Sequence, residues 1–71
     1  MFKTALSGEV NGKEISLYCG KRYKIYIKDN DGHTNILEGF YIEYKGNELL
    51  LKNIDGRWWI SFDAIEDIVE L

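Results

Sequence analysis

Apolar and polar residues alternate along most of this chain, and glycine-containing turns interrupt the alternation. A period of two is typical of β-strands that bury one face. The dipeptides between the alternating stretches are ones that favour hairpin loops, and they are Asn11-Gly12, Asp31-Gly32, Gly46-Asn47 and Asp55-Gly56. The pattern therefore predicts an all-β domain of five or six short strands in sequential hairpins.

The first predicted hairpin has a two-residue loop at Asn11-Gly12, which places Val10 opposite Lys13 and Leu6 opposite Leu17. This register separates the side chains cleanly, as a half-buried hairpin requires. One face carries the apolar residues Leu6, Val10, Ile15 and Leu17, and the other carries Ser7, Glu9, Glu14 and Ser16.

Two further hairpins are predicted between residues 40 and 62. A Gly46-Asn47 loop pairs Tyr44 with Leu49 and Ile42 with Leu51, and an Asp55-Gly56 loop pairs Leu51 with Ile60 and Leu49 with Phe62. The residues expected to face the core are Phe40, Ile42, Tyr44, Leu49, Leu51, Trp58, Ile60 and Phe62. The same parity predicts that Trp58 is buried and that Trp59 is more exposed.

The stretch from Arg22 to Asp29 alternates in the same way. Tyr23, Ile25 and Ile27 are expected inside, and Lys24, Tyr26 and Lys28 on the other face. The strand that returns after this one starts near Thr34. Leu37 and Phe40 both look core-facing there, although a regular strand would point residues 37 and 40 to opposite faces. We therefore predict a β-bulge at Glu38-Gly39, which would bend a long strand so that it serves two sides of a barrel.

The last ten residues, 62–71, fit two structures. A short turn near Asp63 and Ala64 followed by a final strand is our prediction. A helix is the alternative, because Phe62, Ile65 and Ile68 also fit a period of 3.6.

One fold accounts for these elements: a single domain over residues 1–71, built as a small closed or nearly closed antiparallel β-barrel. Closure would also remove exposed strand edges. A chain of 71 residues has a free energy of unfolding of roughly 4–10 kcal/mol, so its stability margin is thin.

Residues 21–71 resemble the small SH3-like barrels, and among them the Sm-like proteins. The resemblance lies in a strand at 23–27, a long bent strand around Gly39, a leucine strand at 49–51 and an I-x-x-I ending within 60–68. It implies an SH3-like barrel. The Sm RNA pocket is not implied, because the loop at 44–47 has no aspartate and Asp55-Gly56-Arg57-Trp58 inverts the order of arginine and glycine.

The net charge and the cysteine content bear on which partners and which cellular compartment we expect. The net charge is −3, whereas domains that bind nucleic acid usually carry a basic surplus. Cys19 is the only cysteine, so the domain has no internal disulfide. Residues 1–8 lack the apolar run of a signal peptide, and no stretch is long and apolar enough to cross a membrane. We expect a cytoplasmic protein without membrane contact.

No group of residues predicts catalysis, a cofactor or a metal site. Cys19 is expected to be a core thiol and His33 a loop residue. The segment Asp29-Asn30-Asp31-Gly32-His33 is explained by turn chemistry, since it lacks the spaced oxygen ligands of a calcium loop. The acidic residues near the C-terminus are expected to be solvated, and these are Asp63, Glu66, Asp67 and Glu70.

The most informative predicted feature is an aromatic and basic sheet face. The registers above place Tyr41 opposite Lys52 and Lys52 opposite Trp59. Lys24, Tyr26 and Lys28 form a second such row. Three interpretations remain open: cross-strand stabilisation of the barrel, a protein interface, and stacking of single-stranded nucleic acid or RNA. We predict a non-catalytic binding module for a protein partner or for self-association, with nucleic-acid binding as the alternative.

Overall fold

The computed structural model describes residues 5–71. Two predictions involve residues 1–4, namely the start of the domain and the absence of a signal peptide, and to that extent they lie outside the described residues. The elements are β1 (Ala5–Val10), β2 (Lys13–Tyr18), β3 (Arg22–Lys28), β4 (Thr34–Lys45), β5 (Glu48–Asn53), β6 (Gly56–Ser61), a 3-10 turn (Phe62–Ala64) and β7 (Ile65–Glu70). The predicted all-β class is confirmed, with seven strands rather than five or six.

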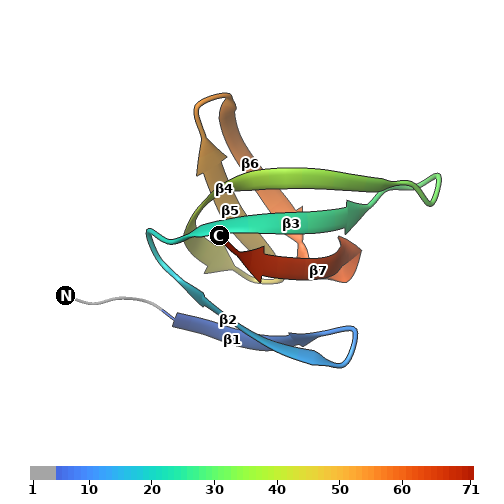
Figure 1. Ribbon diagram of the computed structural model, residues 1–71, viewed down its shortest axis with the longest axis horizontal. Helices are drawn as coiled ribbons and strands as arrows, with labels where there is room; N and C mark the ends of the chain where they lie inside the picture. The colour runs from blue at the N-terminus through green and yellow to red at the C-terminus, as the bar shows by residue number, and fades with distance from the viewer. Residues whose placement is uncertain (1–4) are drawn as a thin grey trace.

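The strands form two antiparallel sheets (Figure 1). Within residues 5–71, β1 and β2 pair only with each other, and the larger sheet has the order β6-β5-β4-β3-β7. Its two edge strands, β6 and β7, do not pair with each other in residues 5–71, so a closed barrel is not found. The β1–β2 hairpin lies beside β7 (Figure 1), and the core fills the space between hairpin and sheet.

The first hairpin has the predicted register. Val10 pairs with Lys13 and Leu6 with Leu17. Asn11 and Gly12 have φ values of 50° and 80°, which is the left-handed pair that a two-residue hairpin loop needs. The predicted polar face of this hairpin is exposed and its apolar face packs on the core.

The predicted inner face of β3 packs on the core. Tyr23 and Ile25 are almost fully buried, and Ile27 packs against the core from the side. The other buried core side chains are Val10, Ile15, Leu17, Tyr41, Leu49, Leu51, Ile60, Ile65 and Ile68.

The predicted facing of β4 is wrong beyond Gly39. Tyr41 is fully buried, whereas Phe40 and Tyr44 are exposed and Ile42 is only half-buried. The strand keeps its alternation from Leu37 through Gly39 to Tyr41, because β3 and β4 pair without a break up to Phe40.

The bulge therefore lies elsewhere than predicted. The β4–β5 register shifts between Tyr41 and Glu43, not at Glu38-Gly39. Gly39 has a different role, since it is buried where β4 crosses β5. β4 still pairs with β3 along one half and with β5 along the other, as expected of the long strand.

The turn between β5 and β6 comes one residue earlier than predicted, at Ile54-Asp55. Asn53 explains the shift, because its side-chain oxygen accepts a hydrogen bond of 2.8 Å from the Asp55 N–H, an Asx turn. Leu51 consequently pairs with Trp58 and not with Ile60, which pairs with Leu49.

This two-residue change of register leaves the parity intact. Ile60 is buried and Trp59 is 46% exposed, as predicted, but Trp58 is only half-buried. Trp58 and Phe62 pack against the margin of the core.

The C-terminal segment is a strand, not the alternative helix. The 3-10 turn begins after Ser61, whose hydroxyl accepts the Asp63 N–H at 3.2 Å. β7 then pairs with β3. Within residues 5–71 no helix has the length and apolar character needed to cross a membrane.

Candidate functional site

The predicted row of Tyr41, Lys52 and Trp59 does not form. Tyr41 is a core residue, and it pairs with Leu51 instead of Lys52. Trp59 does face outward, but its partner in β5 is Leu50. Leu50 is buried although it lies outside the core cluster.

A different aromatic and basic row crosses four strands on the outer face of the larger sheet. Arg22 of β3 pairs with Phe40 of β4, Phe40 pairs with Lys52 of β5, and Lys52 pairs with Arg57 of β6. All four residues are exposed, and Phe40 is 44% accessible. We call these four residues the Phe40 row.

The cations of the Phe40 row carry no counter-charge within the described part of the chain. Four lysine–carboxylate ion pairs are formed there, and neither these nor the His33–Asp29 contact involves Arg22, Lys52 or Arg57. In an acidic protein, three cations beside an exposed phenylalanine make a local positive surface. Such a surface attracts anionic groups, and Phe40 adds apolar contact area.

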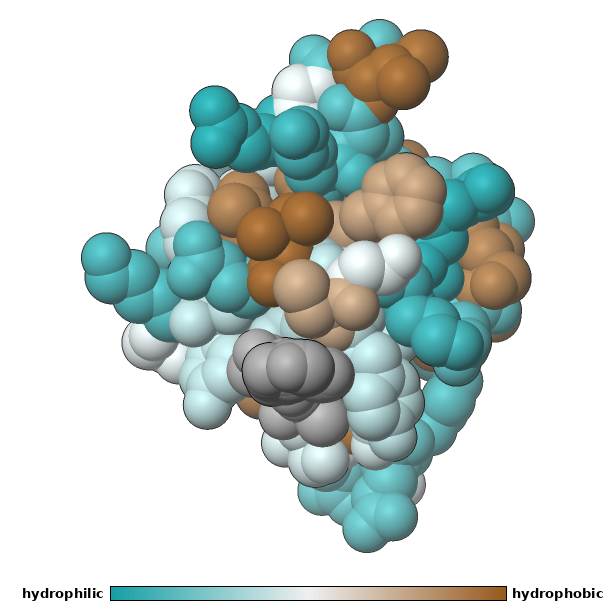
Figure 2. All heavy atoms as spheres, turned by 90° about the vertical axis from the view of Figure 1, so that its left-hand side faces the viewer, coloured by the Kyte–Doolittle hydropathy of each residue, from teal (hydrophilic) through white to brown (hydrophobic). Residues whose placement is uncertain are grey.

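A shallow hollow of about 350 Å³ lies beside the Phe40 row. It is lined by Arg22, Glu38, Gly39, Phe40, Asn53 and Ile54. Ile54, at the tip of the β5–β6 turn, is fully exposed. Figure 2 shows hydrophobic side chains gathered at the middle of one face of the molecule, with hydrophilic ones on either side. Because Phe40 and Ile54 are exposed, they offer apolar contacts, and Arg22 offers a charge at the same hollow.

The second predicted row, on β3, is formed but neutralised. Lys24 lies 3.8 Å from a Glu38 carboxylate oxygen, and Lys28 lies 3.7 Å from Glu66. Tyr26, between them, is half-buried with Ile36 and Asp67 as its cross-strand neighbours. These ion pairs leave little free positive charge at Lys24 and Lys28.

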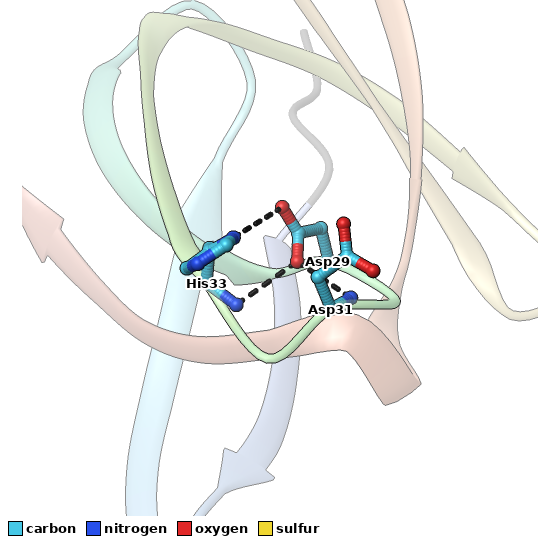
Figure 3. A group of neighbouring side chains, drawn as sticks. All are labelled: Asp29, Asp31 and His33. Carbon is cyan, nitrogen blue, oxygen red and sulfur yellow. Dashed lines mark hydrogen bonds and ion pairs between the residues drawn. The ribbon is translucent and has the colours of Figure 1, made fainter.

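Three side chains that can ligate a metal gather in the β3–β4 loop: Asp29, Asp31 and His33 (Figure 3). The Asp29 carboxylate is already engaged, because one oxygen accepts the N–H groups of Asp31 and His33 at 2.9 Å each. Its other oxygen accepts Asn35 Nδ2 at 3.2 Å. These bonds, led by the one from the His33 backbone, lower the pKa of Asp29. The bonds from the Asp31 and His33 N–H groups to Asp29 are of the kind that aspartate makes in turns.

The acidic C-terminal residues tie neighbouring elements to β7 and the 3-10 turn. Asp67 accepts Lys13 Nζ at 2.8 Å, Glu66 accepts the Thr34 hydroxyl at 2.6 Å, and Glu70 accepts Lys21 Nζ at 3.3 Å. Asp63 accepts Asn47 Nδ2 at 3.0 Å. The hydrogen bond from Lys13 is the main reason that the pKa of Asp67 lies below its ordinary value.

Cys19 and His33, the two residues that could act as a nucleophile and a base, are not members of the Phe40 row. His33 is an exposed loop residue, as predicted. Cys19 is exposed, so its prediction as a core thiol is wrong. The alternation of β2 ends at Tyr18, and Cys19 lies in the turn that leads to β3.

Sequence reasoning missed Arg22, Phe40, Arg57 and Ile54 as surface residues of one site. Phe40 was placed in the core and Tyr41 outside, because the register predicted from the Gly46-Asn47 loop put Phe40 on the same face as Ile42 and Tyr44. Asn53 offered a signal for the turn, because asparagine often begins an Asx turn. No local signal shows that Arg22 and Arg57 share one row.

Comparison with models of known protein families, with curated proteins and with solved structures finds no match for this chain.

Proposed function

We propose that this protein is a non-catalytic binding module whose Phe40 row and adjoining hollow dock an acidic segment of a partner protein. The observation that carries the proposal is the alignment, across four strands, of one exposed phenylalanine with three cations that have no ion-pair partner within residues 5–71. The partner's carboxylates would face Arg22, Lys52 and Arg57, and an apolar side chain would enter the hollow between Phe40 and Ile54.

Energetic considerations support this assignment over simple surface stabilisation. Exposed cations placed next to one another in a row repel each other, so the arrangement does not stabilise the isolated domain. An anionic partner would relieve this repulsion and would steer association. Exposed apolar side chains such as Phe40 and Ile54 gain from burial on contact.

A peptide titration tests the proposal. The probe is a labelled peptide that alternates aspartate and leucine, compared with the same peptide carrying asparagine in place of aspartate. We expect the wild type to bind the acidic peptide more tightly. Lys52→Gln combined with Arg57→Gln should weaken this binding about tenfold or more, since charge-assisted contacts are lost.

The matched control is Lys24→Gln combined with Lys28→Gln. It changes the net charge by the same amount but affects cations that are already paired. Binding that falls equally in both double variants would indicate only a general charge effect and would contradict a site at the Phe40 row. So would the absence of any preference for the acidic peptide.

Nucleic-acid binding is the second candidate, because free cations beside an aromatic ring also suit phosphates and stacked bases. Oligothymidylate is its probe, at low and moderate salt. Binding that falls steeply with salt and depends on Phe40 and Lys52 would favour this candidate over the acidic peptide. The neutralised row on β3 limits the basic path that a long strand could follow.

We also propose that residues 21–71 form an SH3-like fold of the Sm-like type. Support comes from the long β4 that serves two neighbours, from the 3-10 turn before the last strand, and from the pairing of that last strand with β3. An experimental structure that yields a different strand order would contradict this assignment.

A further inference from the structure

The outer edge of β6 has unused hydrogen-bonding groups. The Phe62 N–H donates to the Asn47 carbonyl at 2.9 Å, which points that N–H toward the β4–β5 side of the strand. Because backbone groups alternate in direction along a strand, the N–H and C=O groups of Arg57, Trp59 and Ser61 point away from β5. Within residues 5–71 no partner strand or side chain bonds to them.

The opposite edge of the sheet, on β7, is covered. The Glu66 carbonyl accepts Asn11 Nδ2 at 2.7 Å, and the Ile68 carbonyl accepts Lys13 Nζ at 3.4 Å. The Ile68 N–H donates to the Asp67 carboxylate at 2.8 Å. The tip of the β1–β2 hairpin thus blocks β7, whereas β6 has no such protection. Proteins usually protect long exposed edges.

We propose that β6 pairs with β6 of a second copy of this chain, antiparallel and centred on Trp59, to form a symmetric dimer with one continuous ten-stranded sheet. This proposal concerns the strand edge and does not depend on the binding of an acidic partner.

The sequence of β6 is complementary to itself in this arrangement. Trp59 lies opposite Trp59 of the second copy, where two indoles can stack in an offset geometry. Arg57 lies opposite Ser61 on both sides of the axis, so no like charges face each other. Trp58 lies opposite Ile60, an aromatic and β-branched pair of the kind that stabilises sheets.

The other open edges fit a second copy less well. In the β1–β2 hairpin, Glu9 and Glu14 already stand opposite each other on the exposed face. A second copy of that hairpin would bring two more carboxylates to the same place, which is unfavourable. The symmetric β6 contact also closes at two subunits, whereas pairing of β6 with another strand would continue into chains.

Ser61 provides a test that acts on the edge alone. Its φ is −70°, which proline adopts without strain, and its N–H points to solvent, so Ser61→Pro removes no sheet hydrogen bond from the single chain. In the dimer it removes one hydrogen bond per copy and puts a ring against the neighbouring strand. Ser61→Ala is the control, because it also loses the hydroxyl that accepts the Asp63 N–H but keeps its own N–H.

Sedimentation equilibrium over a range of concentrations measures the dimer. A strand pair of six residues is a small interface, so we expect reversible dimerisation that strengthens with concentration. Ser61→Pro should raise the dissociation constant about tenfold or more relative to Ser61→Ala. Circular dichroism of both variants checks that they are folded.

A charge exchange at the same position tests the register. Ser61→Glu places a carboxylate opposite Arg57 of the second copy and should lower the dissociation constant about threefold, whereas Ser61→Lys should raise it about threefold. A wild type that remains monomeric, a species larger than a dimer, or a dimer that is unaffected by Ser61→Pro and by both charge variants would overturn the proposal.

Discussion

The backbone of Gly39 lies so close to that of Lys52 that a Cβ atom at position 39 would be 2.7 Å from the Lys52 carbonyl oxygen. The same Cβ would lie 3.0 Å from Leu51 Cγ. Real Cβ atoms do not approach a backbone carbonyl so closely, so β4 and β5 can cross here only because residue 39 is glycine. The crossing lets β4 leave β3 and continue along β5, and it presents Phe40 on the outer face.

Gly39→Ala should therefore destabilise the domain. We expect a loss of about 1–3 kcal/mol in the free energy of unfolding, since the clash is with backbone and β4 must move. Urea unfolding monitored by tryptophan fluorescence measures this loss of stability. Gly8→Ala is the control, because it is also a strand glycine but its Cβ would meet nothing within 4 Å. A Gly39→Ala variant as stable as Gly8→Ala would contradict the close crossing.

Two buried tyrosines should respond in opposite ways to loss of the hydroxyl. The Tyr41 hydroxyl is buried without a hydrogen-bond partner in the described residues, whereas the Tyr23 hydroxyl accepts the Tyr18 N–H at 2.8 Å. Burial raises the pKa of both side chains, so both are neutral at pH 7. Tyr41→Phe should stabilise the protein by about 1 kcal/mol, and Tyr23→Phe should destabilise it by about 1–3 kcal/mol.

Thermal unfolding of the two variants under identical conditions tests this difference. Destabilisation by Tyr41→Phe would mean that its hydroxyl makes a favourable contact after all. A neutral Tyr23→Phe would mean that the Tyr18 N–H finds another acceptor.

Acid should weaken the contact between the β1–β2 hairpin and β7. The hydrogen bond from Lys13 lowers the pKa of Asp67 below its ordinary value of 3.8. A carboxyl group whose pKa is lower in the folded state stabilises that state above its unfolded pKa, and loses this contribution as pH falls through the folded pKa. The effect should therefore be complete at neutral pH, begin to decline as the pH approaches the ordinary pKa of about 4, and disappear only below the lowered pKa of Asp67 in the folded state.

The melting temperature of wild type and Asp67→Asn measured against pH tests this contribution. The wild type should melt higher at neutral pH, and the two curves should converge at low pH. Because the pair is exposed, added salt should narrow the gap. A gap that stays constant from neutral to acidic pH would show that ionisation of Asp67 is not its cause.

Leu51→Ala should remove much of the stability of the domain. Leu51 is fully buried beneath the β4–β5 crossing, and truncation of such a leucine costs about 2–5 kcal/mol. Ile54→Ala removes an aliphatic side chain that is fully exposed and should change stability by less than about 0.5 kcal/mol. Chemical denaturation of both variants measures their free energies of unfolding relative to the wild type. A large loss with Ile54→Ala would contradict its exposure at the turn.

Much of the candidate site was beyond prediction from the sequence. Lys52 and Trp59 were correctly expected to face outward, but Tyr41 was assigned the position that Phe40 occupies. Alternation of apolar and polar residues does not by itself show where a bulge lies. If the bulge lies further along the strand than predicted, every side chain between the two positions points to the opposite face of the sheet. Both Phe40 and Tyr41 suit a core by composition, so the sequence offered no means of choosing between them.

The amino-acid sequence by itself determined where the strands lie. It also determined which strand faces are buried wherever a local turn or a regular alternation sets the register. Asn11-Gly12 set the register of the first hairpin, because a two-residue loop leaves the flanking residues only one pairing. The alternation of Tyr23, Ile25 and Ile27 likewise identified the inner face of β3, since burial on one side of a strand imposes that pattern.

Only the tertiary structure decided where β4 bends and which charges remain free. The bend depends on contact between Gly39 and Lys52, and the freedom of the Phe40 row depends on carboxylates from other strands pairing with Lys24 and Lys28 instead. These contacts join residues that are distant in the chain. Their geometry follows from how the strands cross, and no local pattern of apolar and polar residues encodes that crossing.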